Sequence, residues 1–364
     1  MRDTRTPHAT LAGLLTAAAF CAVLGPEARA SGSGDPVTAS KWTINTGANF
    51  ISAPAHATPA HGPMSVVKVT AAAGNTITLD QALPTGSYGP AGAGPFPQYV
   101  VVLRHDGSQE GNGFEGDWMN IASVGGGNTV ITLSPDKLGN TASAVFAPGD
   151  IVEVIKRFSL EELLGSGPTY ANNLKVEQDT DFNDLSEDAG YILVGSAFAN
   201  TLFYHNGGLA PAGWYLDFSI DLGSGATYTF DPDQPIFLFR EDAATDLTVA
   251  GTLQTYSLTH YLTGGITPFS TGFEKPAAIG ISGLLESTGF IQDSDFSDAT
   301  PDNVFTLSGT AFLNTLFYHD GTLTAGARGW YVDFSALDNN FPLEPGIGFF
   351  SDNGNAFAWR HLAP

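Results

Sequence analysis

The chain has 364 residues, with 37 acidic against 14 basic side chains and a formal net charge of −23. A surface this acidic repels nucleic-acid phosphates and anionic lipid, so nucleic acid is excluded as a partner. Charged residues make up only 14%, whereas 43 residues are glycine and 22 are proline, a composition typical of many short strands joined by tight turns.

Residues 1–30 have the pattern of a secretory signal peptide. Arg2 and Arg5 precede the uncharged apolar run 11–24, and Ala28-Arg29-Ala30 is a small-x-small cleavage site. We therefore expect an exported protein of the cell surface, the extracellular space or the periplasm, which the signal does not distinguish. The apolar run is short for a membrane span and no second one follows, so we expect no span in the mature chain.

Removing this segment changes the formal net charge from −23 to −24, because it holds three basic and two acidic residues. It also holds Cys21, the only cysteine of the chain. The mature protein is therefore predicted to have neither disulfides nor thiolate metal sites.

Residues 31–157 are predicted to form an N-terminal β domain of hairpins. The segments 66–83 and 120–138 each contain an apolar strand, a Gly-Asn turn and a β-branched strand, which is a hairpin pattern. The apolar runs "YVVVL" at 99–103 and "IVEVI" at 151–155 are expected to be further strands. We expect no helix in this domain.

A short helical turn is predicted to open each of the two units that follow. Ser159 and Glu162 have the spacing of a capping box. The segment 256–265 has the same plan, with Ser257 as the N-cap, although His260 stands where the capping glutamate would be.

Residues 158–255 and 256–364 are predicted to be two copies of one β unit. Residues 178–207 align without a gap with residues 292–321, and 17 of the 30 positions are identical. We expect an all-β fold in which the N-terminal domain is followed by two homologous repeat units, each like a β-sandwich or barrel.

The chain resembles an uncharacterised family of exported bacterial proteins. The resembling features are "FISAP" at 50–54, the Gly-Asn-Thr hairpins, "APGDIVEVIKRFSLEELLG" at 147–165, Gly-Trp at 213–214 and the aromatic strand that ends in Arg240. They cover most of the mature chain. The resemblance implies an exported, β-rich protein and supplies no catalytic residues to carry over.

The repeated strand "WYLDFS", residues 214–219, carries candidate ligand-binding aromatic residues. With a period of two, the side chains of Trp214, Leu216 and Phe218 face one way and those of the intervening residues face the other. Tryptophan on an apolar face is typical of a core, whereas an exposed tyrosine would stack on a sugar ring. The glycan-binding candidates are Tyr215, Tyr331, Trp214 and Trp330; the alternative is that they build the core.

Two acidic loops, one in each copy, have a ligand spacing that suits calcium. Both begin with D-x-D-x-[NS]-D. Neither is an EF-hand, because Asp184 and Asp298 stand where that loop needs glycine. The alternative is a solvated turn. The candidate calcium ligands are Asp179, Asp181, Asn183, Asp184, Asp293, Asp295 and Asp298, and no other cofactor is predicted.

Four histidines are candidates for catalysis or metal binding. His205 and His319 each precede Asx-Gly, but neither has a serine elbow or a second histidine at a fixed offset, which favours a structural role at a strand end. His56 and His61 have no third metal ligand nearby and are interpreted as loop residues. No catalytic residue is predicted.

These observations favour a secreted, non-enzymatic protein with a structural, adhesive or assembly role. An extracellular carbohydrate-binding module, with or without calcium, and a secreted hydrolase with an unrecognised site stay open as alternatives. Glycans, other surface proteins and further copies of the chain are the expected partners. Exposed Tyr215 and Tyr331 would favour glycan binding, a deep cleft with two close carboxylates would favour hydrolysis, and unpaired edge strands would favour assembly.

Overall fold

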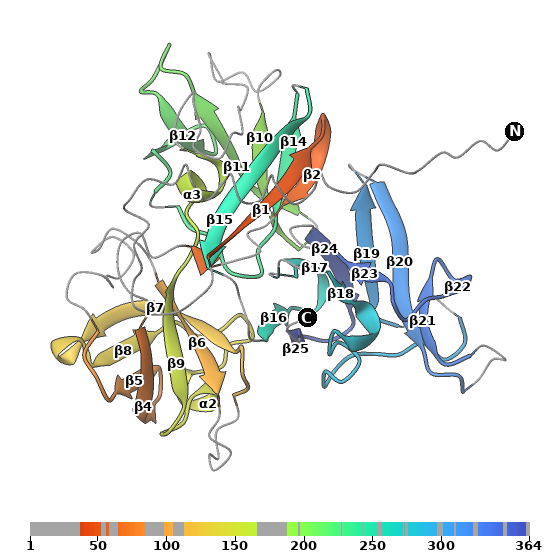
Figure 1. Cartoon of the computed structure of the whole chain (residues 1–364), viewed down its shortest axis with the longest axis horizontal. Helices are drawn as coiled ribbons and strands as arrows, with labels where there is room; N and C mark the ends of the chain where they lie inside the picture. Colours follow the sequence, from red (N-terminus) through yellow and green to blue (C-terminus); the bar gives the residue numbers. More distant parts are fainter. Residues whose placement is uncertain are drawn as a thin grey trace, which may run out of the picture. The chain divides into compact units, whose positions relative to one another are not determined.

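The chain folds into antiparallel sheets, as the composition predicted (Figure 1). The computed structural model describes residues 37–51, 56–57, 65–83, 98–104, 113–165, 188–195, 197–226, 228–241, 243–252, 257–271, 273, 276–296, 301–308, 311–322, 327–344 and 348–361. The prediction of an all-β protein is confirmed. Within these residues, no helix is long and apolar enough to cross a membrane.

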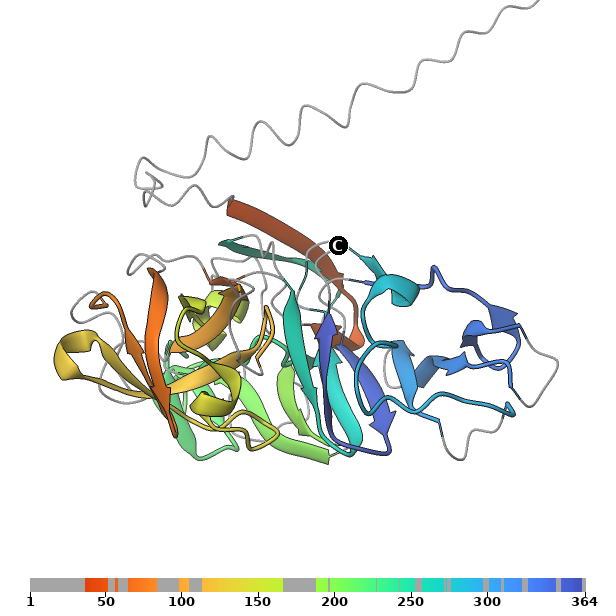
Figure 2. The same ribbon diagram turned by 90° about the horizontal axis from the view of Figure 1, so that it is seen from below.

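A closed six-stranded barrel lies in the N-terminal part of the chain, coloured orange to yellow in Figure 1 and Figure 2. Its strands, in the order in which they pair, are β4 (Ser65–Ala73), β5 (Thr76–Leu79), β8 (Val130–Leu133), β7 (Trp118–Gly125), β6 (Gln98–Arg104) and β9 (Ile151–Lys156). Both predicted hairpins are present: Gly74 turns β4 into β5, and the short turn η1 (Gly126–Asn128) joins β7 to β8.

The expectation of no helix in this region is wrong. The helix α2 (Ala142–Val145) is a single turn, and its buried residues Ala142 and Val145 belong to the barrel core. Four residues are too few to show helical periodicity in the sequence, and burial in the barrel supplies the stability that an isolated turn lacks.

Two six-stranded sheets follow, and their strand orders correspond. The first runs β13 (Ile220–Gly223), β12 (Gly213–Leu216), β11 (Ala197–His205), β10 (Ala189–Val194), β14 (Ile236–Arg240) and β2 (Gly47–Ile51). The second runs β22 (Ala336–Leu337), β21 (Gly329–Val332), β20 (Ala311–His319), β19 (Asn303–Ser308), β24 (Gly348–Asn353) and β17 (Gly265–Ser270). Even the irregularity after Ile192 in the first sheet recurs after Thr306 in the second.

The last strand of the first sheet, β2, comes from the segment that precedes the barrel in the sequence. The strand β2 pairs with β14, and β1 (Val37–Ile44) pairs with β15 (Thr245–Thr252), beside it in Figure 1. In the second copy β17 pairs with β24, and β16 (Leu258–Leu262) with β25 (Phe357–His361). Residues 37–51, assigned from the sequence to the N-terminal domain, therefore complete the first sheet, and the barrel is inserted between β2 and β10. The remaining elements are β3 (His56–Ala57), β18 (Ala277–Ala278), η2 (Ile279–Ile281) and β23 (Pro342–Leu343).

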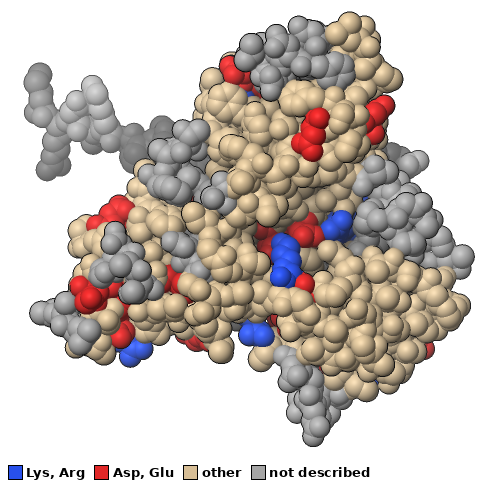
Figure 3. Space-filling model, turned by 180° about the vertical axis from the view of Figure 1, so that it is seen from behind, with Lys and Arg blue, Asp and Glu red and all other residues tan. Residues whose placement is uncertain are grey.

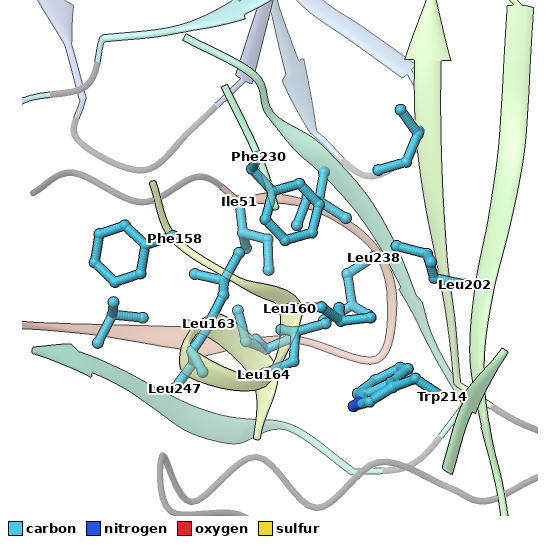
Figure 4. Close-up of a cluster of buried hydrophobic side chains, with 14 of the residues drawn as sticks. Ile51, Phe158, Leu160, Leu163, Leu164, Leu202, Trp214, Phe230, Leu238 and Leu247 are labelled. Carbon is cyan, nitrogen blue, oxygen red and sulfur yellow. The ribbon is translucent and has the colours of Figure 1, made fainter. Parts of the chain in front are cut away.

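The predicted capping box at the start of the first unit is confirmed in α3 (Leu160–Leu164). The hydroxyl of Ser159 accepts the backbone N–H of Glu162 at 3.2 Å, and the Glu162 carboxylate accepts the backbone N–H of Ser159 at 3.0 Å. The leucines of this turn pack beside Trp214 in the core of the first sheet (Figure 4).

The second predicted helical turn is wrong, because residues 258–262 form the strand β16. His260 cannot return a carboxylate to the N-cap, so Ser257 gains no capping box. Thr259 and Tyr261 favour extended backbone. All five residues of the strand are buried, and they pair with β25 along their whole length, which outweighs one turn of helix.

We expect Ser159→Ala to lower the free energy of unfolding by about 1 kcal/mol, because it removes a cap bond. The matched control is Ser257→Ala, where no cap exists; it should change stability by less than about 0.5 kcal/mol. Urea denaturation of the two variants measures the difference, and equal losses would contradict the assignment of strand and helix.

Candidate functional site

The repeated motif builds an aromatic stack in each sheet. The Phe203 ring stacks on Tyr215 with 5.8 Å between centroids and on Phe218 with 4.5 Å. In the second sheet Phe317 repeats both contacts, with Tyr331 at 5.8 Å and Phe334 at 4.5 Å. The same residues at the same distances show that the motif is a packing unit.

The four candidate glycan-binding aromatics are buried. Tyr215 and Tyr331, expected on the exposed face, are only 5% and 8% exposed, and the residues Trp214 and Trp330 are each 1% exposed. The tyrosine hydroxyls donate to carbonyls of Pro211 and Ala327. The alternative interpretation, in which these residues belong to the core, is the one that the structure supports.

The expected alternation along "WYLDFS" fails after Leu216, because the chain turns there. Asp217 and Phe218 have φ of +51° and +59°, two consecutive left-handed residues, as a tight hairpin turn requires. Phe218 therefore packs on the face of Tyr215 and not on that of Trp214. Asp333 and Phe334 repeat the turn, with φ of +50° and +59°.

The aspartate of the motif holds this turn against the neighbouring strand. The Asp217 carboxylate accepts the backbone N–H of Thr201 at 2.8 Å and the side-chain N–H of Asn200 at 2.7 Å. Asp333 accepts the same two groups from Thr315 at 2.8 Å and Asn314 at 3.0 Å. The asparagine and threonine of one strand and the aspartate of the next keep the same spacing in both sheets, because the aspartate must reach both groups.

The repeated histidines are fully buried at strand ends. His205 Nδ1 accepts the backbone N–H of Gly207 at 3.0 Å, the turn contact expected of it. His319 Nδ1 instead lies 2.7 Å from a carboxylate oxygen of Asp293, which is itself 1% exposed. That carboxylate also accepts the backbone N–H of Phe296.

The acidic loops are described only in the second copy and only in part. Asp179, Asp181, Asn183, Asp184 and Asp298 lie outside the described residues, as does His61. Asp293 is bonded to His319, and Asp295 is exposed. His56 lies on β3. In the described part of the chain, no three metal-ligating side chains come together.

A buried charged junction, which the sequence analysis missed, joins the barrel to the first sheet. Lys137 Nζ lies 2.6 Å from Asp233 Oδ1 and 3.4 Å from Asp231 Oδ2. Arg157 Nη1 lies 2.6 Å from Asp231 Oδ1. The basic residues follow barrel strands β8 and β9, whereas the aspartates precede β14. On the face shown in Figure 3, acidic and basic side chains lie side by side near the middle of the molecule.

Burial and charge oppose each other within this junction. Burial raises the pKa of Asp233, whose side chain is 4% exposed. The charge of Lys137 lowers this pKa, and the charge of Asp231 raises it. Burial would also raise the pKa of Asp231, but the cations Lys137 and Arg157 outweigh it and lower that pKa. The two carboxylates raise the pKa of Lys137 against the effect of burial.

A second set of contacts joins the barrel to β16. The Trp118 indole N–H donates to the carbonyl of Thr259 at 2.8 Å, and the Thr259 hydroxyl donates to Asp117 at 2.6 Å. The Tyr261 hydroxyl donates to the Trp118 carbonyl at 3.0 Å and accepts the Trp118 backbone N–H at 3.1 Å. Burial raises the pKa of Asp117, and it raises that of Tyr261 well above its usual value.

These polar groups act as a joint between sheets. Perturbed pKa values can mark an active site. Here each perturbed carboxylate has a cation or a hydroxyl as its partner, and the partners belong to different sheets. The residues come from five separate segments of the chain, so no spacing in the sequence reveals them.

Comparison with protein-family models, with curated proteins and with solved structures finds no match for this chain. The resemblance to an exported bacterial family stays a prediction.

We expect Asp217→Ala to cost about 2 kcal/mol of stability, because it removes two hydrogen bonds and the tolerance of aspartate for positive φ. Asp217→Asn, which keeps that tolerance and one acceptor oxygen, should cost about half as much. Thermal or urea unfolding measures both variants. Asp333→Ala and Asp333→Asn should give the same ranking, and a reversed order would refute the role of the turn.

Lys137→Met should cost about 3 kcal/mol, because it leaves Asp233 buried without its cation. The control is Lys41→Met: Lys41 pairs with Asp246 at 2.7 Å, but the two side chains are 63% and 48% exposed. An exposed pair contributes less than about 1 kcal/mol. Equal losses in urea denaturation would show that the junction carries no special stability.

Proposed function

We propose that the protein is an exported, non-enzymatic structural protein of the cell surface or the extracellular space, and that it works by assembling with further copies of itself. Export rests on the signal pattern of residues 1–30. Assembly rests on an apolar surface of the first sheet, the aromatic patch, defined as Tyr191 and Phe198.

The aromatic patch is the observation that carries this proposal. Phe198 is 58% exposed. The ring of Phe198 lies 4.9 Å from that of Tyr191 and 5.4 Å from that of Phe237, so it is held by ring contacts and still faces solvent. Aromatic side chains fixed in this way are typical anchors of protein interfaces.

The aromatic patch continues an interface that already exists inside the chain. Tyr191, Leu193 and Phe237 of the first sheet form one cluster with Ile266 of β17 and Phe305 of β19 in the second sheet. Strand β10 contacts β17, and strand β2 contacts β19, which is the corresponding pair. The first sheet packs on the second through this surface. The same surface extends beyond that contact and stays exposed there. A second copy of the chain is the occupant that this continuity favours.

The outer strands support the same proposal. Strands β13 and β22 stand last in their sheets, and in the described residues no further strand pairs with them. Ile220 and Leu337 on these strands are 51% and 47% exposed. Exposed strand edges can accept a strand from another chain. The alternatives have less support, since the candidate sugar-binding aromatics are buried and Asp293 is bonded to His319.

Sedimentation velocity of residues 31–364 over a wide range of concentrations tests the proposal. The wild type should form dimers or larger species, and Phe198→Ser should shift it toward the monomer. Leu209→Ser is the matched control, because Leu209 is 70% exposed but lies outside the aromatic patch. A wild type that stays monomeric throughout would refute assembly; equal effects of both variants would refute the patch.

A further inference from the structure

Two histidines face each other inside the second copy of the repeat. His260 on β16 and His361 on β25 are both fully buried, and His260 Nε2 lies 3.3 Å from His361 Nδ1. The other nitrogen of each ring, His260 Nδ1 and His361 Nε2, has no hydrogen-bond partner in the described structure. The pair therefore shares one hydrogen bond, and among the described residues no acid is paired with either ring to stabilise a charge.

Aromatic side chains enclose this pair. The His361 ring stacks on Trp359 with 4.7 Å between centroids, and Phe273 meets it edge-on at 4.8 Å. The His260 ring lies 4.8 Å from Trp359 and 5.6 Å from Phe269. An imidazolium in this setting would lose its hydration without gaining a counter-ion.

The strand that carries His260 also holds the barrel. Successive residues of a strand point to opposite faces. Thr259 and Tyr261 bond Asp117 and Trp118 of the barrel, whereas His260 between them lies on the opposite face and meets His361 of β25 there. Any event that displaces β16 from β25 therefore also acts on the joint with the barrel.

We propose that the His260–His361 pair is an acid-sensitive latch. At neutral pH the uncharged pair holds β16 against β25; in acid, protonation of the two rings forces the strands apart and loosens the joint between β16 and the barrel. The latch is independent of self-association, because neither histidine belongs to the aromatic patch.

The charged groups around the pair make protonation harder. Burial is the largest cause that lowers the pKa of His260 well below its usual value, and the positive charges of His361 and Lys137 add to it. Burial lowers the pKa of His361 to about 3. The acids of the neighbourhood are engaged elsewhere: Asp233 faces Lys137, and Asp117 faces Thr259 and Arg360.

The direction of the pH effect follows from these shifts. A histidine whose pKa is lower in the folded than in the unfolded state contributes its stability above about pH 6.5, the unfolded value. That stability is lost as the pH falls toward the folded value. Between pH 6.5 and 4.5, the opening equilibrium rises about fiftyfold through His361 alone, because its ring is half protonated in the open form at pH 6.5 and almost fully protonated at pH 4.5.

Hydrogen exchange of the mature chain, residues 31–364, tests the latch at pH 6.5 and pH 4.5, with rates corrected for the intrinsic effect of pH. The protection of the β16 and β25 amides should fall by at least about fiftyfold, and that of β10 and β11 in the first sheet should not follow. In the double variant His260→Gln and His361→Gln, which cannot be protonated in this range, the loss should vanish. Loss of protection that is the same in all sheets, or that persists in the variant, would overturn the proposal.

Two further measurements keep the test decisive if the double variant folds poorly. Histidine ring signals of the wild type, followed by NMR, should stay neutral for the pair below pH 5 while the protein is folded; titration near pH 6.5 would overturn the latch. His319→Gln serves as the control variant, because His319 is equally buried but has Asp293 as its partner. It should keep the wild-type pH dependence of β16 and β25.

Discussion

The burial of Trp118 against β16 is the contact on which the arrangement of the described sheets depends. Its indole N–H, backbone N–H and carbonyl are all bonded to Thr259 or Tyr261, and Lys137 lies over its ring at 5.3 Å. Lys137 also pairs with Asp233, which precedes β14 in the first sheet. Because buried polar groups need their partners, these bonds hold the barrel and the sheets in one arrangement. No cysteine lies among the described residues, so no disulfide contributes to this arrangement there.

Hydrogen bonds and ring contacts explain the asparagine, threonine, aspartate and aromatic residues of the repeated motif. Its asparagine, threonine and aspartate close a hairpin turn, and its phenylalanine and tyrosine stack behind that turn. The two copies differ where their surroundings differ. Trp214 donates its indole N–H to Gly165 at the end of α3, whereas Trp330, whose copy has β16 in place of that helix, has no such partner in the described structure. The local bonds are the same in both sheets, and the remaining contacts differ with their tertiary context.

Local patterns in the sequence were good guides where the deciding contacts are local. The Gly-Asn hairpins, the capping box of Ser159 and the all-β class follow from turn chemistry and periodicity, which act over a few residues. The same reasoning failed at residues 256–265, because pairing with β25, about a hundred residues away, outweighed a weak helical signal. It failed at Tyr215 as well. Alternation predicts that neighbouring residues of a strand lie on opposite faces, but it does not predict that both faces of the sheet are buried.

The sequence by itself determined the chemistry of this protein: a single cysteine, an acidic composition, a β-rich fold and a motif that occurs twice. Only the tertiary structure decided how those parts are used. It inserted the barrel between β2 and the rest of its sheet, gathered Lys137, Arg157, Asp231 and Asp233 from distant segments, and enclosed His260 with His361. The physical reason is that charge pairing and burial depend on distance in space, and residues with no relation in sequence share one neighbourhood only after the sheets have formed.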